Sequence, residues 1–335
     1  LLADDGVIFI SIDDTECSNL ILICNEIFGA GNFVANVSWQ RTYSPRNDSK
    51  GIVSEVEHLV VFSKNPGWQP NKLPRTEAMD SRYKNPDNDV APWKSSDAFA
   101  PGAATHQGMV YAIQHPFTGE MLYPSNGRCW RYQQSSMLEY MQGWCNYRLE
   151  NLHDEKERAR VCGIDESAVR KDVLAIVLEE SLEVSATKAQ KVYNRGRWPG
   201  FYFTKGGYGG IARKTYLENV GGRLPTNLWM YEETGHTDEA KKELISLFGG
   251  RSPFDTPKPT RLLDFVLKVA GTSETLMLDS FAGSGTTAHA VLNANKADNG
   301  NRHFILIEMM DYADSITAER VKRVIRGYGE GKKAV

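Results

Sequence analysis

Apolar residues in the first and last parts of the chain form either short continuous runs or helix-spaced stripes. The continuous runs at 7–12 and 275–280 are typical of strands buried on both faces of a sheet. Further strands are predicted at 33–40, 57–64 and 303–309. Helices are predicted at 15–28, 237–250, 256–271, 286–295 and 315–327, with Thr237 as one N-cap. The alternation after 275 predicts a βαβα unit with parallel strands.

Residues 67–225 have a different texture, with frequent Pro, Gly, Asn and Trp. Short strands and one long helical stretch at about 151–195 are predicted there. We interpret this region as a domain inserted into an α/β core that 1–66 and 226–335 form together. The opening LLADDG is typical of a helix end stopped at Gly6, so we expect the sequence to be a piece of a longer protein.

The chain has 335 residues, 41% of them hydrophobic and 24% charged, which is ordinary for a globular protein of about two domains. No apolar run approaches the ~20 residues that span a bilayer, so no membrane partner is expected. The five cysteines form no C-x-x-C pair, which disfavours a disulfide framework and favours a cytoplasmic location. The net charge of -3 gives no overall basic character, so nucleic-acid binding must rest on local charge.

The sharpest motif is DSFAGSGTTAHA at 279–290, between a predicted strand and a predicted helix. Gly283 and Gly285 fit G-x-G-x-x-[GA], and their missing side chains let the backbone approach a nucleotide-like ligand. Glu308 follows at close to the ~20-residue spacing of an acid that binds ribose hydroxyls. The alternative is a tight structural turn with a solvated Glu308, in which Thr286 and Thr287 only cap the helix.

The position of this loop in the chain separates two classes of ligand. Only one further βα unit follows it, whereas a dinucleotide needs two such half-sites in one sheet. The rest of the sheet must come from 1–66, which gives a permuted order of elements. A nicotinamide-dependent oxidoreductase is therefore disfavoured.

These residues resemble a known family. DSFAGSGTTAHAV resembles the cofactor loop of the amino-methylating DNA methyltransferases of the beta class. LWMYEETGHTDEAKKEL and FDTPKPTRLLDFVL are similar to segments of the Mod subunit of type III restriction-modification systems. The resemblance implies an α/β, Rossmann-like class I methyltransferase fold with permuted motif order. It also implies S-adenosyl-L-methionine as cofactor and an inserted α+β target-recognition domain at 67–225.

The same resemblance implies roles for individual residues. Glu308 would bind the cofactor ribose, and Lys258 with Pro259 would lie beside its methionine end. The residues implied for the cofactor loop are Asp279, Phe281, Gly283, Gly285, Thr286 and Thr287.

The family's catalytic Asp-Pro-Pro-Tyr motif, with Asn or Ser as variants of the first residue, has no counterpart in this sequence, which holds no Pro-Pro pair. In the family this motif precedes the segment that resembles GVIFISIDD, so we expect it upstream of Leu1. We therefore expect no efficient methyl transfer by this chain alone. Asp13 and Asp14 are interpreted as helix-capping acids and not as a replacement.

Two local basic stretches carry the argument for DNA. Basic residues alternate with aromatic rings at 190–223, a combination that suits phosphates and unpaired bases. A second basic loop lies at 40–50. The predicted DNA contacts are Arg41, Arg46, Lys50, Arg195, Arg197, Lys205, Arg213 and Lys214. The alternatives are a solvated hairpin with its rings in the core, and an ordinary surface loop.

The resemblance implies a site-specific adenine-N6 methyltransferase that acts on double-stranded DNA. Its implied partners are a second Mod copy and a restriction (Res) helicase-nuclease subunit. The residue chemistry alone does not separate adenine from N4-cytosine methylation. A catalytically dead DNA-binding or assembly subunit is the alternative from a different functional class.

Overall fold

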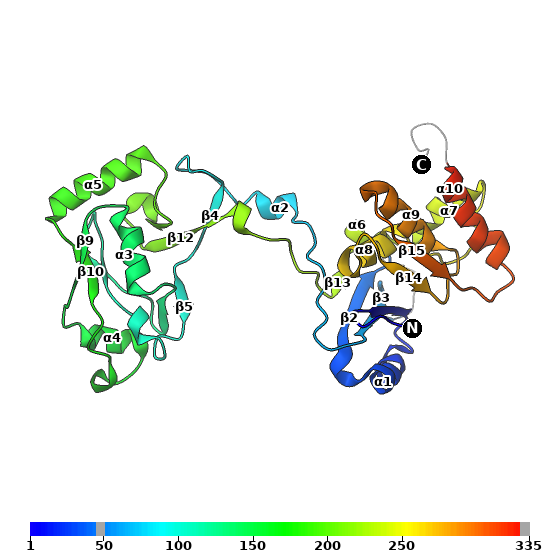
Figure 1. Cartoon of the computed structure of the whole chain (residues 1–335), viewed down its shortest axis with the longest axis horizontal. Helices are drawn as coiled ribbons and strands as arrows, with labels where there is room; N and C mark the ends of the chain where they lie inside the picture. Colours follow the sequence, from blue (N-terminus) through cyan, green and yellow to red (C-terminus); the bar gives the residue numbers. More distant parts are fainter. Residues whose placement is uncertain (45–50, 329–335) are drawn as a thin grey trace. The chain divides into compact units, whose positions relative to one another are not determined.

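The computed structural model describes residues 1–44 and 51–328, and the chain forms two compact units (Figure 1). The split unit combines Leu1–Pro74 with the chain from Gly222 onward, and the inserted unit is Arg75–Gly221. The sequence placed these boundaries at 66/67 and 225/226. In the part of the chain that the structure describes, no helix is both long and apolar enough to cross a membrane.

The larger sheet of the split unit has the strand order β1-β3-β2-β13. β1 and β2 each run antiparallel to β3, and β13 runs parallel to β2. The bounds are β1 (Val7–Ile12), β2 (Phe33–Gln40), β3 (Val56–Ser63) and β13 (Leu228–Trp229). Helix α1 (Cys17–Phe28) packs against β3, and a short 3-10 helix η1 (Ala30–Asn32) follows it. β1 was predicted to be buried on both faces, but it lies at the edge of this sheet and is mostly half-buried.

The second sheet of the split unit is a parallel pair, as the βαβα pattern predicted. Its strands are β14 (Leu276–Asp279) and β15 (His303–Leu306), joined through α9 (Thr286–Asp298). After β15 come the π-helix η6 (Ala313–Ala318) and α10 (Glu319–Arg326). Helix α8 (Thr260–Ala270) packs against α9, and its apolar side chains contact both sheets. Helices therefore cover one face of the β14–β15 pair.

Two further helices complete the split unit, α6 (Tyr231–Thr234) and α7 (Thr237–Phe248). The N-cap of α7 is His236, whose ring accepts a hydrogen bond from the Glu239 amide at 3.2 Å. The predicted N-cap, Thr237, is instead the first helical residue, because the imidazole already satisfies the free amide.

The inserted unit contains three small sheets with the orders β7-β6-β10-β9, β11-β12-β4 and β5-β8. Its strands are β4 (Trp93–Asp97), β5 (Phe99–Pro101), β6 (Ile113–Gln114), β7 (Met121–Leu122), β8 (Arg128–Trp130), β9 (Tyr147–Glu150), β10 (Ala175–Leu178), β11 (Phe201–Phe203) and β12 (Ile211–Tyr216). Its helices are α2 (Glu77–Asp80), α3 (Gln134–Gln142), α4 (Glu155–Cys162) and α5 (Leu182–Arg195). The 3-10 helices are η2 (Gln107–Met109), η3 (Glu166–Ala168), η4 (Lys205–Gly207) and η5 (Leu217–Asn219).

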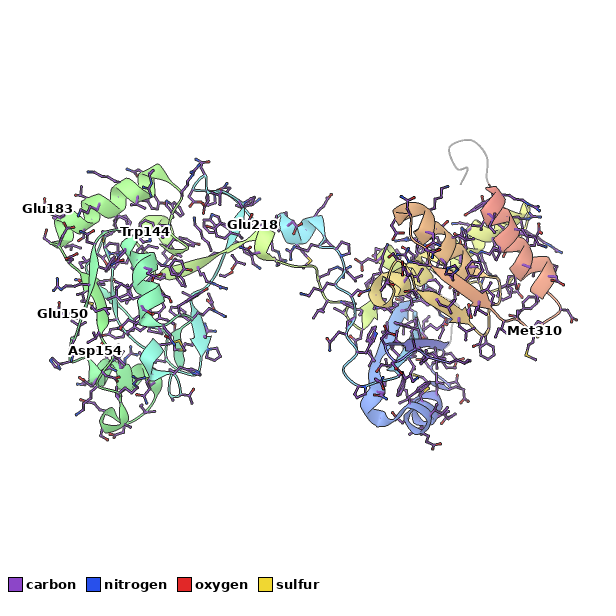
Figure 2. The ribbon with its side chains drawn as sticks, in the orientation of Figure 1. Trp144, Glu150, Asp154, Glu183, Glu218 and Met310 are labelled. Atoms are coloured by element: carbon purple, nitrogen blue, oxygen red, sulfur yellow. The ribbon has the colours of Figure 1, made fainter. Side chains whose placement is uncertain are left out.

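Aromatic side chains fill the core of the inserted unit. Trp144, labelled in Figure 2, is 1% exposed, and its indole N–H donates to the carbonyl of Phe201 at 2.9 Å. The indole of Trp130 likewise donates to the carbonyl of Tyr111 at 2.8 Å. Because each buried N–H has a partner, these large rings can be buried without an unsatisfied polar group.

Two predicted helical segments are wrong. The stretch 151–195 is not one helix, because the buried strand β10 separates α4 from α5. A four-residue apolar run has no period that distinguishes a strand from a helix, and pairing with β9 and β6 decides the outcome. At the start of the chain, Gly6 closes a turn by donating to the Ala3 carbonyl at 2.8 Å and does not end a helix.

Candidate functional site

The glycine loop lies between the end of β14 and the start of α9, where the sequence predicted it. Gly283 and Gly285 both have positive φ, at +51° and +76°, a backbone region that suits glycine. A Cβ on Gly285 would lie 3.0 Å from the backbone oxygen of Thr317, and one on Gly283 would lie 3.3 Å from Phe254. The turn into α9 therefore requires glycine for both its dihedral angles and its space.

Asp279 at the end of β14 holds this turn together from within. One carboxylate oxygen accepts the Phe281 amide at 3.1 Å, and the other accepts the Thr287 hydroxyl at 2.5 Å. The carboxylate thus ties the strand to both the loop and the first turn of α9. In this structure Asp279 and Thr287 are therefore hydrogen-bonded to each other, and this contact fixes the conformation of the loop.

Glu308 follows β15 and reaches the glycine loop. Its carboxylate accepts hydrogen bonds from the amides of Met310 at 3.0 Å and Gly283 at 2.8 Å. These backbone hydrogen bonds, with Met310 as the largest contribution, lower the pKa of Glu308. The structure therefore brings the predicted acid and the predicted loop together, with the acid ionised at neutral pH.

Exposed apolar side chains flank this acid and the glycine loop in the sequence. Phe281 in the loop is 84% exposed, and Met309 beyond β15 is 87% exposed. Met310, labelled in Figure 2, is also exposed. Such a combination of exposed apolar side chains, a carboxylate and loop backbone suits a nucleoside, whose flat base can lie on the apolar surface.

Lys258 precedes α8 and is linked to the loop through the main chain. Thr286 donates its hydroxyl to the Lys258 carbonyl at 3.1 Å. The Lys258 ammonium forms an ion pair with Glu57 of β3 and lies 5.5 Å from the centre of the Trp39 ring. The Glu57 carboxylate also accepts the hydroxyl of Ser11 at 2.5 Å. Glu57 was not predicted, because its position in an apolar strand gives no signal of such a partner.

The two acids after β1 have different roles. Asp13 accepts the Thr15 amide at 3.1 Å in a local turn, but it does not cap α1 as predicted, because the N-cap residue of that helix is Glu16. Asp14 does not cap α1, because it accepts from Ser54 at 3.0 Å and contacts the His58 ring at 2.8 Å. The hydrogen bond with His58 is the largest cause of the lowered pKa of Asp14.

The predicted DNA contacts differ in their accessibility. Arg195, Arg197 and Lys205 are exposed, whereas Arg213 is half-buried. Arg41 is half-buried and lies 4.0 Å from Glu57. Arg46 and Lys50 lie outside the residues that the structure describes.

Lys214 is not a DNA contact in this structure, which corrects the prediction. Its side chain is fully buried, and its ammonium lies 2.5 Å from carboxylate oxygens of both Asp87 and Asp89. It also donates to the Trp198 carbonyl at 2.8 Å. A buried cation with three partners has no donor left for a phosphate, so Lys214 is part of the framework.

The aromatic residues of 190–223 mostly belong to the core. Phe201 and Phe203 are each 1% exposed, and Tyr202 is 7% exposed. Tyr208, at 63% exposed, is the clear exception. The interpretation of these rings as core contacts is therefore confirmed for β11, and stacking on bases is left to Tyr208.

Comparison with known sequences decides the family. The sequence model of the DNA methylases matches residues 1–319. The chain belongs to the DNA methylase family.

Relatives within this DNA methylase family include two type III Mod subunits. The chain is 30% identical to that of enzyme StyLTI from Salmonella typhimurium, over 97% of the chain and 43% of the relative. It is 28% identical to that of EcoPI from Escherichia phage P1, over 92% of the chain and 43% of the relative. The type II methyltransferase M.KpnI from Klebsiella pneumoniae is 27% identical, over 92% of the chain and 63% of the relative.

The predicted resemblance to DNA methyltransferases and to Mod subunits is thus confirmed. The chain spans less than half the length of these two Mod relatives.

Proposed function

We propose that this chain carries the cofactor-binding and DNA-recognition parts of a site-specific adenine-N6 DNA methyltransferase of the type III Mod kind. The observation that supports this most directly is the hydrogen bond from the Gly283 amide to Glu308, at the ends of a parallel strand pair. In a chain of the DNA methylase family, that arrangement favours S-adenosyl-L-methionine as the ligand.

The residues at the loop fit this cofactor. Its adenosine needs a carboxylate for the ribose hydroxyls, an apolar surface for the base and close backbone approach. Glu308 and Phe281 would supply the first two, and Gly283 with Gly285 the third. Lys258 and the turn at Thr286 would lie toward the methionine end. When bound, the cofactor supplies an electrophilic methyl group on a sulfonium.

The proposed arrangement is a class I methyltransferase core in permuted order, with the inserted unit as its target-recognition domain. Arg195, Arg197 and Lys205 would bind DNA phosphates, as exposed basic side chains do. The reaction requires a target base flipped out of the duplex, and we assign the catalytic step to no residue of this chain. The partners we propose are double-stranded DNA, a second Mod copy and a Res helicase-nuclease, in the cytoplasm.

Calorimetric titration tests the cofactor assignment. The wild-type chain should bind S-adenosyl-L-methionine and not NAD. Gly283→Val should abolish that binding, because a branched side chain would fill the loop and strain its positive φ. Gly249→Val is the matched control, since Gly249 also has a positive φ, of +75°, but open space around it. Unchanged affinity in Gly283→Val, or a preference for NAD, would contradict the proposal.

The base specificity requires a different measurement. DNA methylated by the full-length gene product should contain N6-methyladenine on nucleoside analysis. N4-methylcytosine in its place would leave the cofactor assignment intact and overturn the choice of base.

A further inference from the structure

A buried arginine lies directly behind the glycine loop. Arg320 is in the first turn of α10 and is 0% exposed, although arginine is seldom buried without partners. Helix α10 packs against α9 and α7 (Figure 1). The Arg320 side chain forms hydrogen bonds with residues of α7 and α8. The hydrogen-bond acceptors around its guanidinium are Ser284, Thr286, Thr260, Glu243 and His289.

One edge of the guanidinium contacts the loop. Its Nη1 donates to the Ser284 hydroxyl at 3.1 Å and to the Thr286 hydroxyl at 2.9 Å. One turn earlier, the Thr317 hydroxyl donates to the Gly283 carbonyl at 2.5 Å. Thr317 and Arg320 therefore form hydrogen bonds with Gly283 and Ser284, before Gly285, and with Thr286, after it.

The other edge of the guanidinium anchors it to the helices. Its Nη2 donates to Glu243 of α7 at 2.8 Å and to the Thr260 hydroxyl of α8 at 3.1 Å. Nη2 also lies 3.0 Å from Nδ1 of His289 on α9. The planar fork of an arginine spreads five donors over three nitrogens and can serve these acceptors at once, whereas a lysine ammonium has three donors on a single nitrogen.

His289 is neutral in this cluster and completes it. Burial, followed by the charge of Arg320, lowers its pKa from 6.5 to about 3. Its Nδ1 must then accept from Arg320, which leaves Nε2 protonated and 3.1 Å from the Tyr328 hydroxyl. The 3.8 Å approach of His289 to Glu243 is consequently not an ion pair at neutral pH.

We propose that Arg320 is a positioning residue, which holds the loop from Gly283 to Thr286 in the conformation that binds the cofactor. The inference rests on the proposed function, because it concerns the same site. The guanidinium is 0% exposed, so it would act on a ligand through the loop and not by direct contact. It fixes two loop hydroxyls relative to α7, α8 and α9, so the loop pays less conformational entropy when the ligand binds.

Two substitutions on α10 separate positioning from stability. Arg320→Lys keeps the charge near Glu243 but loses the fork, and it should weaken binding of S-adenosyl-L-methionine at least tenfold. Arg323→Met is the matched control one turn away, where the side chain contacts Glu319 at 2.7 Å and the Leu247 carbonyl at 2.9 Å. The control should lower the melting temperature and leave affinity within twofold. Hydrogen exchange at the Gly283 and Gly285 amides should rise only in Arg320→Lys.

A milder variant covers the case in which Arg320→Lys does not fold. Ser284→Ala removes one loop acceptor and leaves the arginine in place, and it should weaken binding about threefold or more. Wild-type affinity in every folded Arg320 and Ser284 variant would overturn the positioning role alone. Failure of the wild-type chain itself to bind S-adenosyl-L-methionine would overturn the proposed function first.

Discussion

The sheets of the two units differ in how completely they are covered. In the inserted unit, all four residues of β10 are buried. In the split unit, the β14–β15 pair leaves one face open, with Leu276 60% exposed and Leu278 42% exposed. Ile305 and Ile307 on the neighbouring segment are 48% and 52% exposed. The inserted unit thus completes its own core, whereas the pair that carries the glycine loop is packed from one side.

This difference indicates which interactions stabilise each unit. The inserted unit relies on aromatic packing and on buried polar groups that are satisfied, such as the indoles of Trp130 and Trp144. The β14–β15 pair relies on α8, α9 and the hydrogen bonds around Arg320 and Glu308. Elements with fewer buried apolar contacts open more readily, so polar contacts matter more at the loop than in the inserted unit.

Removing the buried cation of the inserted unit should have the largest effect. Lys214→Met leaves Asp87 and Asp89 without a counter-charge, which should lower the free energy of unfolding by about 3–5 kcal/mol. Chemical denaturation measures this change. The control Lys191→Met alters an exposed lysine of the same unit and should cost at most about 0.5 kcal/mol. Similar losses in both variants would contradict the framework role of Lys214.

Truncating one apolar side chain in each sheet tests the contrast directly. Ile176→Ala in β10 should cost about 2–5 kcal/mol, because the side chain is 0% exposed and its loss leaves a cavity. Leu278→Ala in β14 should cost only about 1 kcal/mol, because water already reaches that side chain. Equal costs in denaturant melts would mean that the open face of β14 is covered in solution.

Acid should weaken the split unit through His289. Its pKa in the folded chain, about 3, lies below the ordinary 6.5, so the unfolded chain binds the proton more readily. The contribution of neutral His289 to the free energy of unfolding is fully present above pH 6.5. It falls as the pH drops, and about 2 kcal/mol of it is lost near pH 5. His289→Asn keeps an acceptor for Arg320 and should flatten this part of the stability profile. Burial also lowers the pKa of His115 in the inserted unit. Because the wild type and His289→Asn both contain His115, its effect on the stability profile is the same in the two and cancels when they are compared.

Surface charge should have the smallest effect on stability and a clear one on DNA. Reversing Arg195, Arg197 and Lys205 to Glu should change the free energy of unfolding by about 0.5 kcal/mol or less. DNA affinity should fall, and its salt slope should decrease by about one for each lost phosphate contact. A control with the same charge change reverses the exposed Lys242, Lys268 and Lys322 of the split unit. Equal DNA affinity in the two triple variants would exclude the predicted basic surface.

Much of the split unit could be predicted because its signals are local. The apolar stripe predicts α8, and the strand-glycine-helix order at 275–295 predicts β14, the loop and α9. Glu308 could be placed beside Gly283 because parallel strands end at the same edge of a sheet. These predictions required only residues that are near in sequence or joined by one crossover.

The wrong assignment of Lys214 and the missed role of Arg320 concern partners that are distant in the sequence. Lys214 was assigned to DNA by its charge, but its carboxylate partners lie 127 and 125 residues away. Arg320 was not predicted at all, although one signal was present. Arg320 lies three positions after the buried Thr317 of η6, and an arginine at such a buried position indicates a buried polar partner.

The two chain segments that enter and leave the inserted unit are paired at its base. Leu73 and Arg223 exchange backbone hydrogen bonds of 2.8 and 2.9 Å in an isolated antiparallel bridge. Both residues of this bridge belong to the split unit, so its two hydrogen bonds involve no atom of the inserted unit. We therefore expect that a different module with adjacent termini can be joined to the split unit at the same two positions.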